Sequence, residues 1–281
     1  MGAYRYGVFM LAAVLTFLTF GLLSEKWESR PRTAPKAKYA GCPVSPDALM
    51  RIMPVGDSLT EGMGSSDYNG YRLFLYNLLM EKCSERYVEF IGSQHSGSYA
   101  SNDMYGLSQT EGYSGYSIDH FLAHSREGLS ATLARNPSVI LLHIGTNDMS
   151  PLRVPNAPSP ATAPERLTDL IDIILTSAPN AVLLVAQLVH SPNAGWTDHS
   201  PAYNAAIPRI VARKQRKGYK IMTVDMRSVG AECVRNLDGS DVVCEDLIED
   251  GVHPRDKGYE KMAAIWYEGL RNATNRGYFA V

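Results

Sequence analysis

The sequence predicts an α/β fold in which helices cover both faces of a parallel sheet. Short apolar segments typical of buried strands alternate with longer segments whose apolar residues recur at helical spacing. Two of the short segments end directly in polar turn residues, Gly56-Asp57-Ser58 and Gly145-Thr146-Asn147. Open α/β folds carry their chemistry at such strand ends. With 281 residues and 45% hydrophobic content, the chain is long enough for one large core plus an appendage.

The N-terminal segment is predicted to lie outside this fold. Its apolar run, residues 7–23, follows Arg5 and is long for the core of a signal peptide but short for a spanning helix. We expect residues 1–24 to be a signal peptide or signal-anchor, residues 25–45 a linker, and residues 46–275 the folded domain. The Lys and Arg residues that follow the run disfavour an exporting anchor, whereas cleavage removes that difficulty. The protein is therefore expected to be secreted, or tethered to a membrane and facing the lumen or exterior.

Cysteines and charge add to this picture. Cys42, Cys83, Cys233 and Cys244 allow three full pairings, and Cys233 with Cys244 would close a short loop; buried free thiols are the alternative. The tripeptide Asn272-Ala273-Thr274 is a glycosylation sequon, usable only in a eukaryotic secretory route. A net charge of -2 gives no indication of a nucleic-acid partner.

Five segments have the length and apolar content of strands and lie between turn residues. They are Leu49–Val55, Val88–Ile91, Ser138–Ile144, Ala181–Gln187 and Ile221–Val224. Five longer segments follow them and are predicted to be helices, because their apolar residues have helical spacing. They are Tyr71–Cys83, Ile118–Leu133, Glu165–Ser177, Tyr203–Lys217 and Lys257–Arg271, the last one with Asp256 as its expected cap.

Two connections between these elements are unusually long. The segment Gly92–Gly115 is dense in Ser, Gly, Asn and Tyr and is predicted to be a functional loop, because ordinary connections in α/β folds are much shorter. The proline-rich segment Pro151–Pro164 is predicted to be a stiff connector.

Ser58 is the candidate nucleophile. Gly56, Asp57 and Ser58 end the first predicted strand in a sharp turn into a helix, which would place Ser58 Oγ at the carboxyl edge of the sheet. An ordinary turn serine is the alternative, because turns favour these residue types on geometry alone.

A nucleophilic serine needs a base, a group that orients the base, and donors for the oxyanion. Only His253 has an acid at short, fixed spacing in a loop, and Asp250 can hold one imidazole nitrogen while the other faces Ser58. The alternative is an unrelated Asp and His in a surface turn. Candidate oxyanion donors are the Ser58 N–H, a glycine N–H on the long loop, and the Asn147 amide, which donates without a charge.

The other histidines indicate no metal centre. His120 and His124 lie four residues apart on a predicted helix, but no third ligand has a recognisable spacing, so neither a metal nor a cofactor is expected. His143 lies within the third predicted strand and is expected to be a hydrogen-bonded core histidine.

Four short blocks in this order resemble the signature blocks of the SGNH (GDSL) hydrolase family. They are Gly-Asp-Ser-Leu at 56–59, Glu-Gly-Tyr-Ser-Gly at 111–115, Gly-Thr-Asn-Asp at 145–148 and Asp-Gly-Val-His at 250–253. The resemblance implies Ser58 as nucleophile, His253 as base, Asp250 as acid, and Ser58, Gly115 and Asn147 as the oxyanion hole; Gly112 is the weaker choice for the glycine. It also implies a flavodoxin-like three-layer α/β/α sandwich with a five-stranded parallel sheet in the order 2-1-3-4-5, and acyl-enzyme hydrolysis without a metal.

Within the family, the sequence around these blocks is similar to carbohydrate esterase family 3, whose members deacetylate xylan. The resemblance therefore implies a serine esterase that hydrolyses acetyl or other short acyl esters, on a small molecule or a polysaccharide such as acetylated xylan. Tyr113, Tyr116 and Trp196 are candidates for sugar-stacking surfaces, with ordinary packing as the alternative. An α/β-hydrolase is disfavoured, since Gly-x-Ser-x-Gly is absent and the acid lies three residues before the histidine.

Two other functions stay open from the sequence. One is a lipid esterase or lysophospholipase of the same fold, because the acyl pocket leaves no sequence signature. The other is a catalytically silent carbohydrate-binding protein.

Overall fold

The structure, a computed structural model, describes residues 42, 49–82, 88–98, 103, 105–124, 129–150, 157–236 and 242–279. All these residues belong to one compact unit of the chain, residues 36–281. The predicted signal segment, residues 1–24, and nearly all of the predicted linker lie outside the described residues. Among the residues that are described, no helix has the length and apolarity required to span a bilayer.

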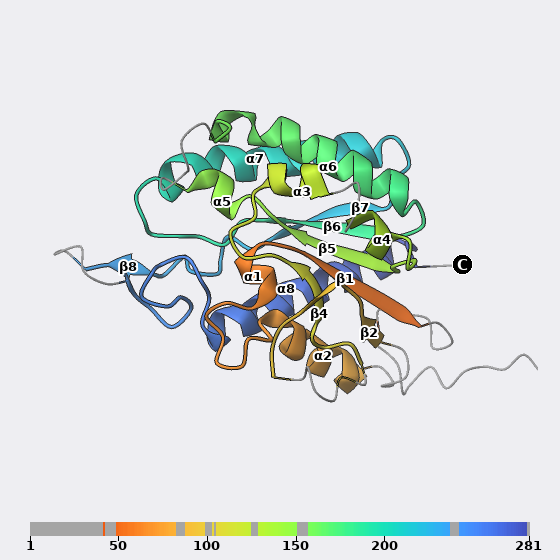
Figure 1. The fold of residues 1–281 in the computed structure, drawn as a ribbon, viewed down its shortest axis with the longest axis horizontal. Helices are drawn as coiled ribbons and strands as arrows, with labels where there is room; N and C mark the ends of the chain where they lie inside the picture. Colours follow the sequence, from red (N-terminus) through yellow and green to blue (C-terminus); the bar gives the residue numbers. More distant parts are fainter. Residues whose placement is uncertain are drawn as a thin grey trace, which may run out of the picture. The chain divides into compact units, whose positions relative to one another are not determined.

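Five parallel strands form the centre of the fold in the predicted order (Figure 1). Across the sheet they are β2 (Val88–Phe90), β1 (Met50–Gly56), β5 (Val139–His143), β6 (Val182–Gln187) and β7 (Ile221–Asp225). Numbered along the chain, these five strands have the order 2-1-3-4-5, which confirms the flavodoxin-like topology. Because the strands are parallel, their carboxyl ends meet at one edge, where β1 and β5 are direct neighbours.

Two short strands enlarge this sheet to seven. β4 (Gln109–Gly112) runs parallel to the end of β1, and β3 (Gln94–His95) pairs antiparallel with β4. The prediction of a plain loop over Gly92–Gly115 is therefore wrong in this part. The residues of β4 are mostly polar, and their extended conformation depends on pairing with β1, so no local apolar pattern marks the strand.

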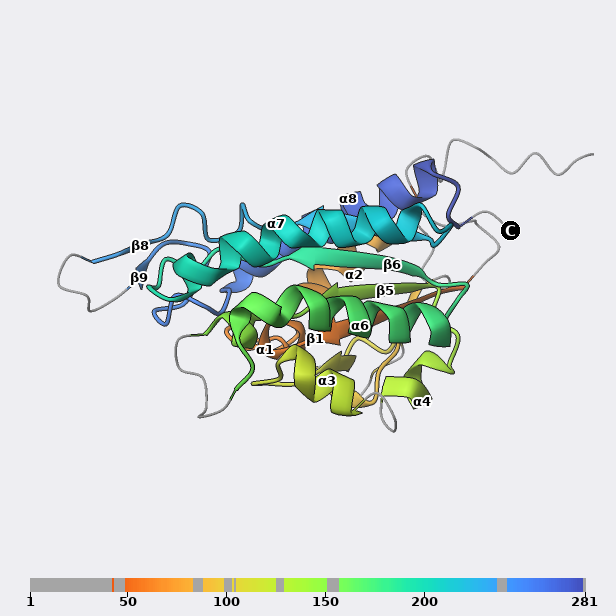
Figure 2. The same cartoon turned by 90° about the horizontal axis from the view of Figure 1, so that it is seen from above.

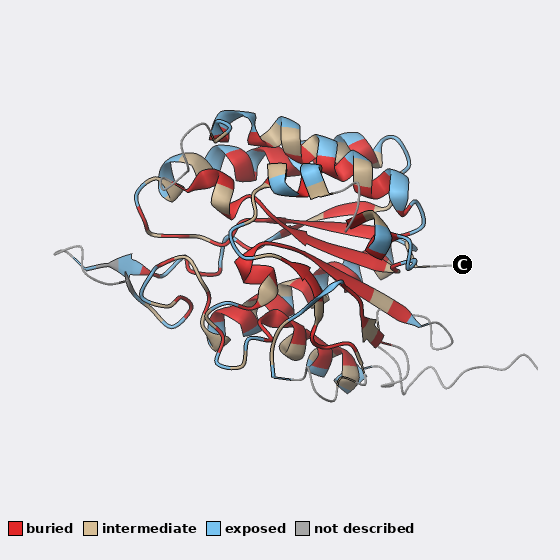
Figure 3. Cartoon of the chain, in the orientation of Figure 1, coloured by how far each residue is buried: buried red, intermediate tan, exposed pale blue. Residues whose placement is uncertain are grey.

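Helices cover both faces of the sheet. α2 (Tyr71–Lys82) and α8 (Asp256–Asn275) cover one face, and α3 (Ile118–His124), α6 (Ala163–Ser177) and α7 (Trp196–Gln215) cover the other (Figures 1 and 2). Alternate side chains of the strands enter two separate apolar clusters, one on each face. Figure 3 shows the central strands buried between the helical layers. This arrangement confirms the predicted three-layer sandwich.

Two of the predicted helices differ clearly from the observed ones. The segment predicted as one helix, Ile118–Leu133, contains α3 and the separate short α4 (Ser130–Leu133). α7 begins at Trp196, seven residues before the predicted start, although Pro201 and Pro208 lie inside it. Each proline removes one backbone N–H donor from the helix. Both proline side chains are exposed, so the buried side of the helix still packs on the sheet.

Asp256 does not cap α8. It is the first helical residue, and the preceding Arg255 occupies the cap position without a side-chain capping bond. Asp256 Oδ1 instead accepts a hydrogen bond from Ser66 N at 2.8 Å. The carboxylate therefore fixes a loop that follows the candidate nucleophile. In the predicted proline-rich connector, residues 151–156 lie outside the described residues, and a short 3-10 turn, η3 (Pro160–Thr162), leads into α6.

One of the three cysteine pairings considered from the sequence is present. Cys233 and Cys244 form a disulfide that brackets the hairpin of β8 (Val234–Arg235) and β9 (Val242–Val243). Cys42 is also disulfide-bonded, and no cysteine among the described residues is free. The alternative of buried free thiols is therefore wrong for these residues. Cys83 lies outside the described part of the chain.

Candidate active site

The candidate nucleophile lies where β1 ends and α1 (Ser58–Glu61) begins, as the sequence predicts. Asp57 caps α1, because its Oδ1 accepts a hydrogen bond from Leu59 N at 3.1 Å. Gly56 leaves no room for a side chain, since a Cβ there would lie 2.1 Å from His143 O. The close approach of β5 therefore requires glycine at the end of β1, and Ser58 follows at the carboxyl edge of the sheet.

The structure brings the predicted base and acid to Ser58. Ser58 Oγ lies 2.8 Å from His253 Nε2, and His253 Nδ1 lies 2.5 Å from Asp250 Oδ2. The loop that carries both residues is closed by a bridge between Leu247 and Pro254. With a proton on Nδ1 that Asp250 accepts, Nε2 is left to accept the Ser58 hydroxyl proton, which is the arrangement of a Ser-His-Asp triad.

Asp250 is held in its charged form. Partial burial acts to raise the pKa of its carboxyl, but hydrogen bonds from His253 and from the backbone N–H groups of His253 and Val252 outweigh it, and the pKa lies below its usual value. The donated bonds, at 2.8 Å from Val252 N and 3.0 Å from His253 N, also fix the carboxylate in place. A permanently charged acceptor keeps the imidazole in one tautomer and stabilises it when it becomes protonated.

The segments that carry the predicted oxyanion donors lie next to β1, whose end leads into Ser58. Asn147 is in the first turn of α5 (Thr146–Met149), directly after β5, and its Nδ2 donates to Tyr116 O at 2.9 Å. The chain between β4 and α3 is also anchored to the strand that carries Ser58, because Tyr113 N donates to Gly56 O at 2.9 Å. Within the described residues, neither Ser58 N–H nor Gly115 N–H donates a hydrogen bond, as an oxyanion donor requires before substrate binds.

The two glycines of the second block have different surroundings. A Cβ on Gly112 would lie 2.4 Å from Glu61 N, so this glycine is required where β4 packs against α1. Gly115 has a φ of 78° and nothing lies within 4 Å of an added Cβ. Gly112 therefore has a packing role, whereas Gly115 is exposed and has no such role, which leaves Gly115 as the preferred candidate for the oxyanion donor.

Sequence reasoning pointed to Trp196 at this site but missed Asn193, in the loop between β6 and α7. Asn193 Nδ2 donates to Asp250 O at 2.7 Å, and Trp196 Nε1 donates to Thr146 O at 3.0 Å. The loop before α7 therefore contacts Asp250, which orients His253, and the first residue of α7 contacts Thr146, which precedes Asn147. Only the density of polar residues between Ser191 and Ser200 marks this loop, and many surface loops share that composition.

Arg72 is a second residue that the sequence did not indicate. Its guanidinium group is fully buried and donates to the carbonyl oxygens of Thr60 at 2.6 Å, Glu61 at 3.1 Å and Leu107 at 2.9 Å. Burial lowers the pKa of Arg72. The cation binds the carboxyl end of α1, where helix carbonyls are unsatisfied, and thereby supports the helix that begins with Ser58.

Asp148, next to Asn147, fixes the neighbouring helices. Its Oδ2 accepts from Ile118 N at 3.0 Å and its Oδ1 accepts from Arg166 Nη2 at 2.9 Å. Burial raises the pKa of Asp148 to about 6 in spite of these two bonds. The fourth residue of the Gly-Thr-Asn-Asp block therefore joins α5 to the starts of α3 and α6.

The tyrosines considered as sugar platforms pack mainly against other rings. Tyr116 stacks on Tyr113, with ring centroids 4.5 Å apart, and on His120, with centroids 5.0 Å apart. The face of Tyr116 is thus covered by protein, which supports the packing interpretation. His124 contacts Tyr113 edge-on. His120 and His124 belong to this ring cluster, and no group of three potential metal ligands occurs among the described residues.

His143 is fully buried, as the sequence predicts, and burial lowers its pKa. Its two ring nitrogens have no hydrogen-bond partner within the described residues, so the expected bond is not found there.

Comparison with known proteins identifies the family of this chain. The sequence pattern of the GDSL-like lipase/acylhydrolase family matches residues 55–261. The chain belongs to this family. That result confirms the family predicted from the four blocks, and the matched region contains all five predicted site residues.

Solved structures of the family share this fold. A family 3 carbohydrate esterase of Clostridium thermocellum is 35% identical, with a TM-score of 0.60 over 80% of this chain and 99% of that one. A carbohydrate esterase of family 3 from Talaromyces cellulolyticus is 19% identical, with a TM-score of 0.62 over 81% of this chain and 99% of that one. At this identity the similarity shows a shared fold only. The first of these agrees with the predicted similarity to carbohydrate esterase family 3.

A curated relative is much longer than this chain. The multidomain esterase of Ruminococcus flavefaciens is 31% identical in an alignment of 241 positions that covers 79% of this chain and 28% of that protein. The chain thus spans just over a quarter of that relative.

Proposed function

We propose that the protein is a serine esterase that removes acetyl groups from carbohydrate through an acyl-enzyme. The observation that carries this proposal is the continuous contact from Ser58 Oγ to His253 Nε2, at 2.8 Å, and from His253 Nδ1 to Asp250 Oδ2, at 2.5 Å. The carbohydrate esterase that is 35% identical supports acetylated carbohydrate as the substrate class.

The contacts of the triad support the following reaction. Ser58 Oγ attacks the ester carbonyl while His253 Nε2 accepts its proton, and the negative charge that develops on the carbonyl oxygen is stabilised by Ser58 N–H, Gly115 N–H and Asn147 Nδ2. His253 then protonates the leaving sugar hydroxyl. Water, deprotonated by His253, attacks the acyl-enzyme in the same way and releases acetate, which restores Ser58.

A panel of esters tests the substrate class. The full chain is incubated with acetylated xylan, an acetylated monosaccharide and the 4-nitrophenyl esters of acetic and decanoic acid, and the released acid is measured. We expect acetyl esters to be hydrolysed at much higher kcat/KM than the decanoate, and acetylated xylan to release acetate. A preference for decanoate would replace this proposal with a lipid esterase.

Export is part of the proposal. Disulfides persist in oxidising compartments, and the structure contains the pair Cys233 and Cys244. Fractionation of the expressing cells should recover the protein outside the cytosol. Recovery in the cytosol with reduced thiols would contradict export.

A further inference from the structure

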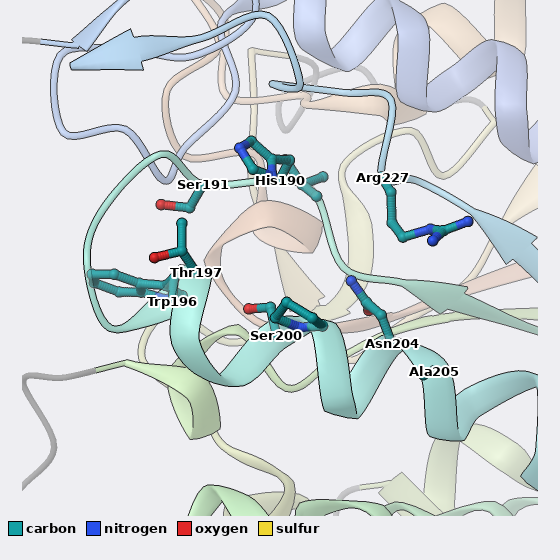
Figure 4. A pocket seen from close by; sticks show the side chains of 10 residues that line it. His190, Ser191, Trp196, Thr197, Ser200, Asn204, Ala205 and Arg227 are labelled. Carbon is teal, nitrogen blue, oxygen red and sulfur yellow. The ribbon is translucent and has the colours of Figure 1, made fainter.

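A cavity of about 270 Å³ lies beside the candidate active site. Figure 4 shows the loop that carries His190 and Ser191 opposite the first turns of α7, with Arg227 at one side. Ligand pockets typically measure about 300–1,000 Å³, so the cavity lies just below that range and suits one small ring. None of the triad residues lines it.

The lining combines apolar surface with hydroxyl groups. Trp196 and Pro201 supply apolar wall, and Ser191, Thr197 and Ser200 supply hydroxyl groups. A flat aromatic surface with neighbouring hydroxyls suits a sugar ring, whose C–H face packs on the aromatic ring while its own hydroxyls exchange hydrogen bonds. A long acyl chain is a poor match, because it would desolvate these hydroxyls and give them no partner.

The charge of the cavity disfavours an anionic ligand. Arg227 is its only Arg or Lys, and Asp225 neutralises it with two bonds, from Arg227 Nε to Oδ1 at 2.8 Å and from Nη2 to Oδ2 at 2.7 Å. An acidic sugar would have to compete with this carboxylate. The surroundings therefore suit an uncharged ring.

The cavity is connected to the candidate catalytic residues through its own walls. Trp196, which lines it, donates from Nε1 to Thr146 O, next to Asn147. Asn193, in the loop that forms the opposite wall, donates to Asp250 O. A ring bound here would therefore lie in the same group of loops as the ester, at the carboxyl edge of the sheet.

We propose that this cavity binds an uncharged pyranose unit of the glycan, other than the unit that carries the ester. The inference rests on the proposed function, because it assigns a second sugar to the same substrate. Binding there adds affinity for a chain of several sugars and adds nothing for an isolated acetyl ester.

Direct binding tests the cavity without turnover. In the Ser58→Ala background, xylopentaose is titrated by calorimetry into three full-length proteins: Ser58→Ala alone, with Ala205→Trp, and with Ala202→Trp. Ala205 lines the cavity on α7, so an indole there fills it; Ala202 is exposed on the same helix but does not line the cavity. We expect Ala205→Trp to weaken binding by about tenfold or more and Ala202→Trp to leave it unchanged.

A second, smaller substitution keeps the test informative if the Ala205→Trp variant does not fold. Ser200→Ala removes one hydroxyl of the cavity, and we expect it to weaken xylopentaose binding about fivefold, the usual effect of one hydrogen bond. Equal binding by all these proteins, or no measurable binding by Ser58→Ala alone, would overturn the inference.

The proposed function is tested separately, by hydrolysis of 4-nitrophenyl acetate by the protein with Ser58 intact. Failure of that hydrolysis would contradict the esterase, whereas the calorimetry contradicts only the cavity assignment. In the active protein, a selective loss of long-acyl hydrolysis on Ala205→Trp, with xylopentaose binding unchanged, would identify an acyl pocket and overturn the sugar assignment.

Discussion

Ser58 Oγ and His253 Nε2 lie 2.8 Å apart although 195 residues separate them in the chain. The sheet brings them together, because β1 delivers Ser58 to its carboxyl edge and the loop before α8 returns to the same edge. The closed loop from Leu247 to Pro254 then presents the imidazole to the hydroxyl. The proposed chemistry therefore depends on a long-range contact made by the fold.

Replacement of the acid tests the role of Asp250. Asp250→Asn removes the charge that fixes the His253 tautomer, and we expect kcat for an acetyl ester to fall roughly 10⁴-fold with KM little changed. Glu249→Gln is the matched control, because it neutralises the adjacent carboxylate, which contacts only Arg255 among the described residues. Similar small effects of both substitutions on steady-state kinetics would contradict the role of Asp250.

Asn147→Ala tests the side-chain oxyanion donor. The substitution removes the amide that donates to Tyr116 O in the free protein, and we expect kcat to fall about 10²–10³-fold, because one donor to the developing charge is lost. Asn147→Asp keeps the shape but places a carboxylate near the oxyanion, so its kcat should be lower still. A fall confined to KM in either variant would mean that Asn147 binds substrate without stabilising the transition state.

The two glycines of the second block should differ in stability and rate. Gly112→Ala pushes a Cβ toward Glu61 N, so we expect a melting temperature lowered by several degrees. Gly115→Ala meets no neighbour, and its positive φ costs about 1–2 kcal/mol at most. We expect Gly115→Ala to lower kcat more than it lowers thermal stability. The reverse ranking, from calorimetry and kinetics together, would reassign the oxyanion glycine to Gly112.

Stability should depend on the ionisation of Asp148. Its pKa is raised to about 6 in the folded protein, whereas the unfolded chain titrates near 4, so between these values the folded state binds more protons and the free energy of unfolding falls as pH rises. Asp148→Asn lacks this titration. In urea unfolding, the stability of the wild type minus that of Asp148→Asn should therefore be larger at pH 4 than at pH 7, by up to about 3 kcal/mol. A difference that grows with pH would show that the Arg166 ion pair dominates and lowers the pKa.

Much of this molecule could be predicted from sequence because its informative residues are local. Gly56, Asp57 and Ser58 encode a tight turn, and Asp250 and His253 lie close enough in sequence to form their contact within one loop. Asn193 and Arg72 could not be predicted, since their partners, Asp250 O and the end of α1, are adjacent only after folding.

The secondary-structure errors have similar causes. β4 is polar and is extended because it pairs with β1, and the early start of α7 at Trp196 is hidden by Pro201, which locally disfavours helix. Asp256 has the residue type of a helix cap but bonds instead to a distant amide, Ser66 N. In each case a tertiary contact outweighs the local preference.

The proposed chemistry depends above all on activation of the Ser58 hydroxyl by His253. A fluorophosphonate probe, which modifies activated serines, is incubated with the wild type and with Ser58→Ala, Ser65→Ala and His253→Ala, and labelling is measured by intact mass and peptide mapping. Ser65 is the control, because it is a buried serine close in sequence that bonds to Gly62 O. We predict one label, on Ser58, in the wild type and Ser65→Ala, none in Ser58→Ala, and labelling slowed by several orders of magnitude in His253→Ala. Labelling of the folded Ser58→Ala protein at the wild-type rate would contradict the account.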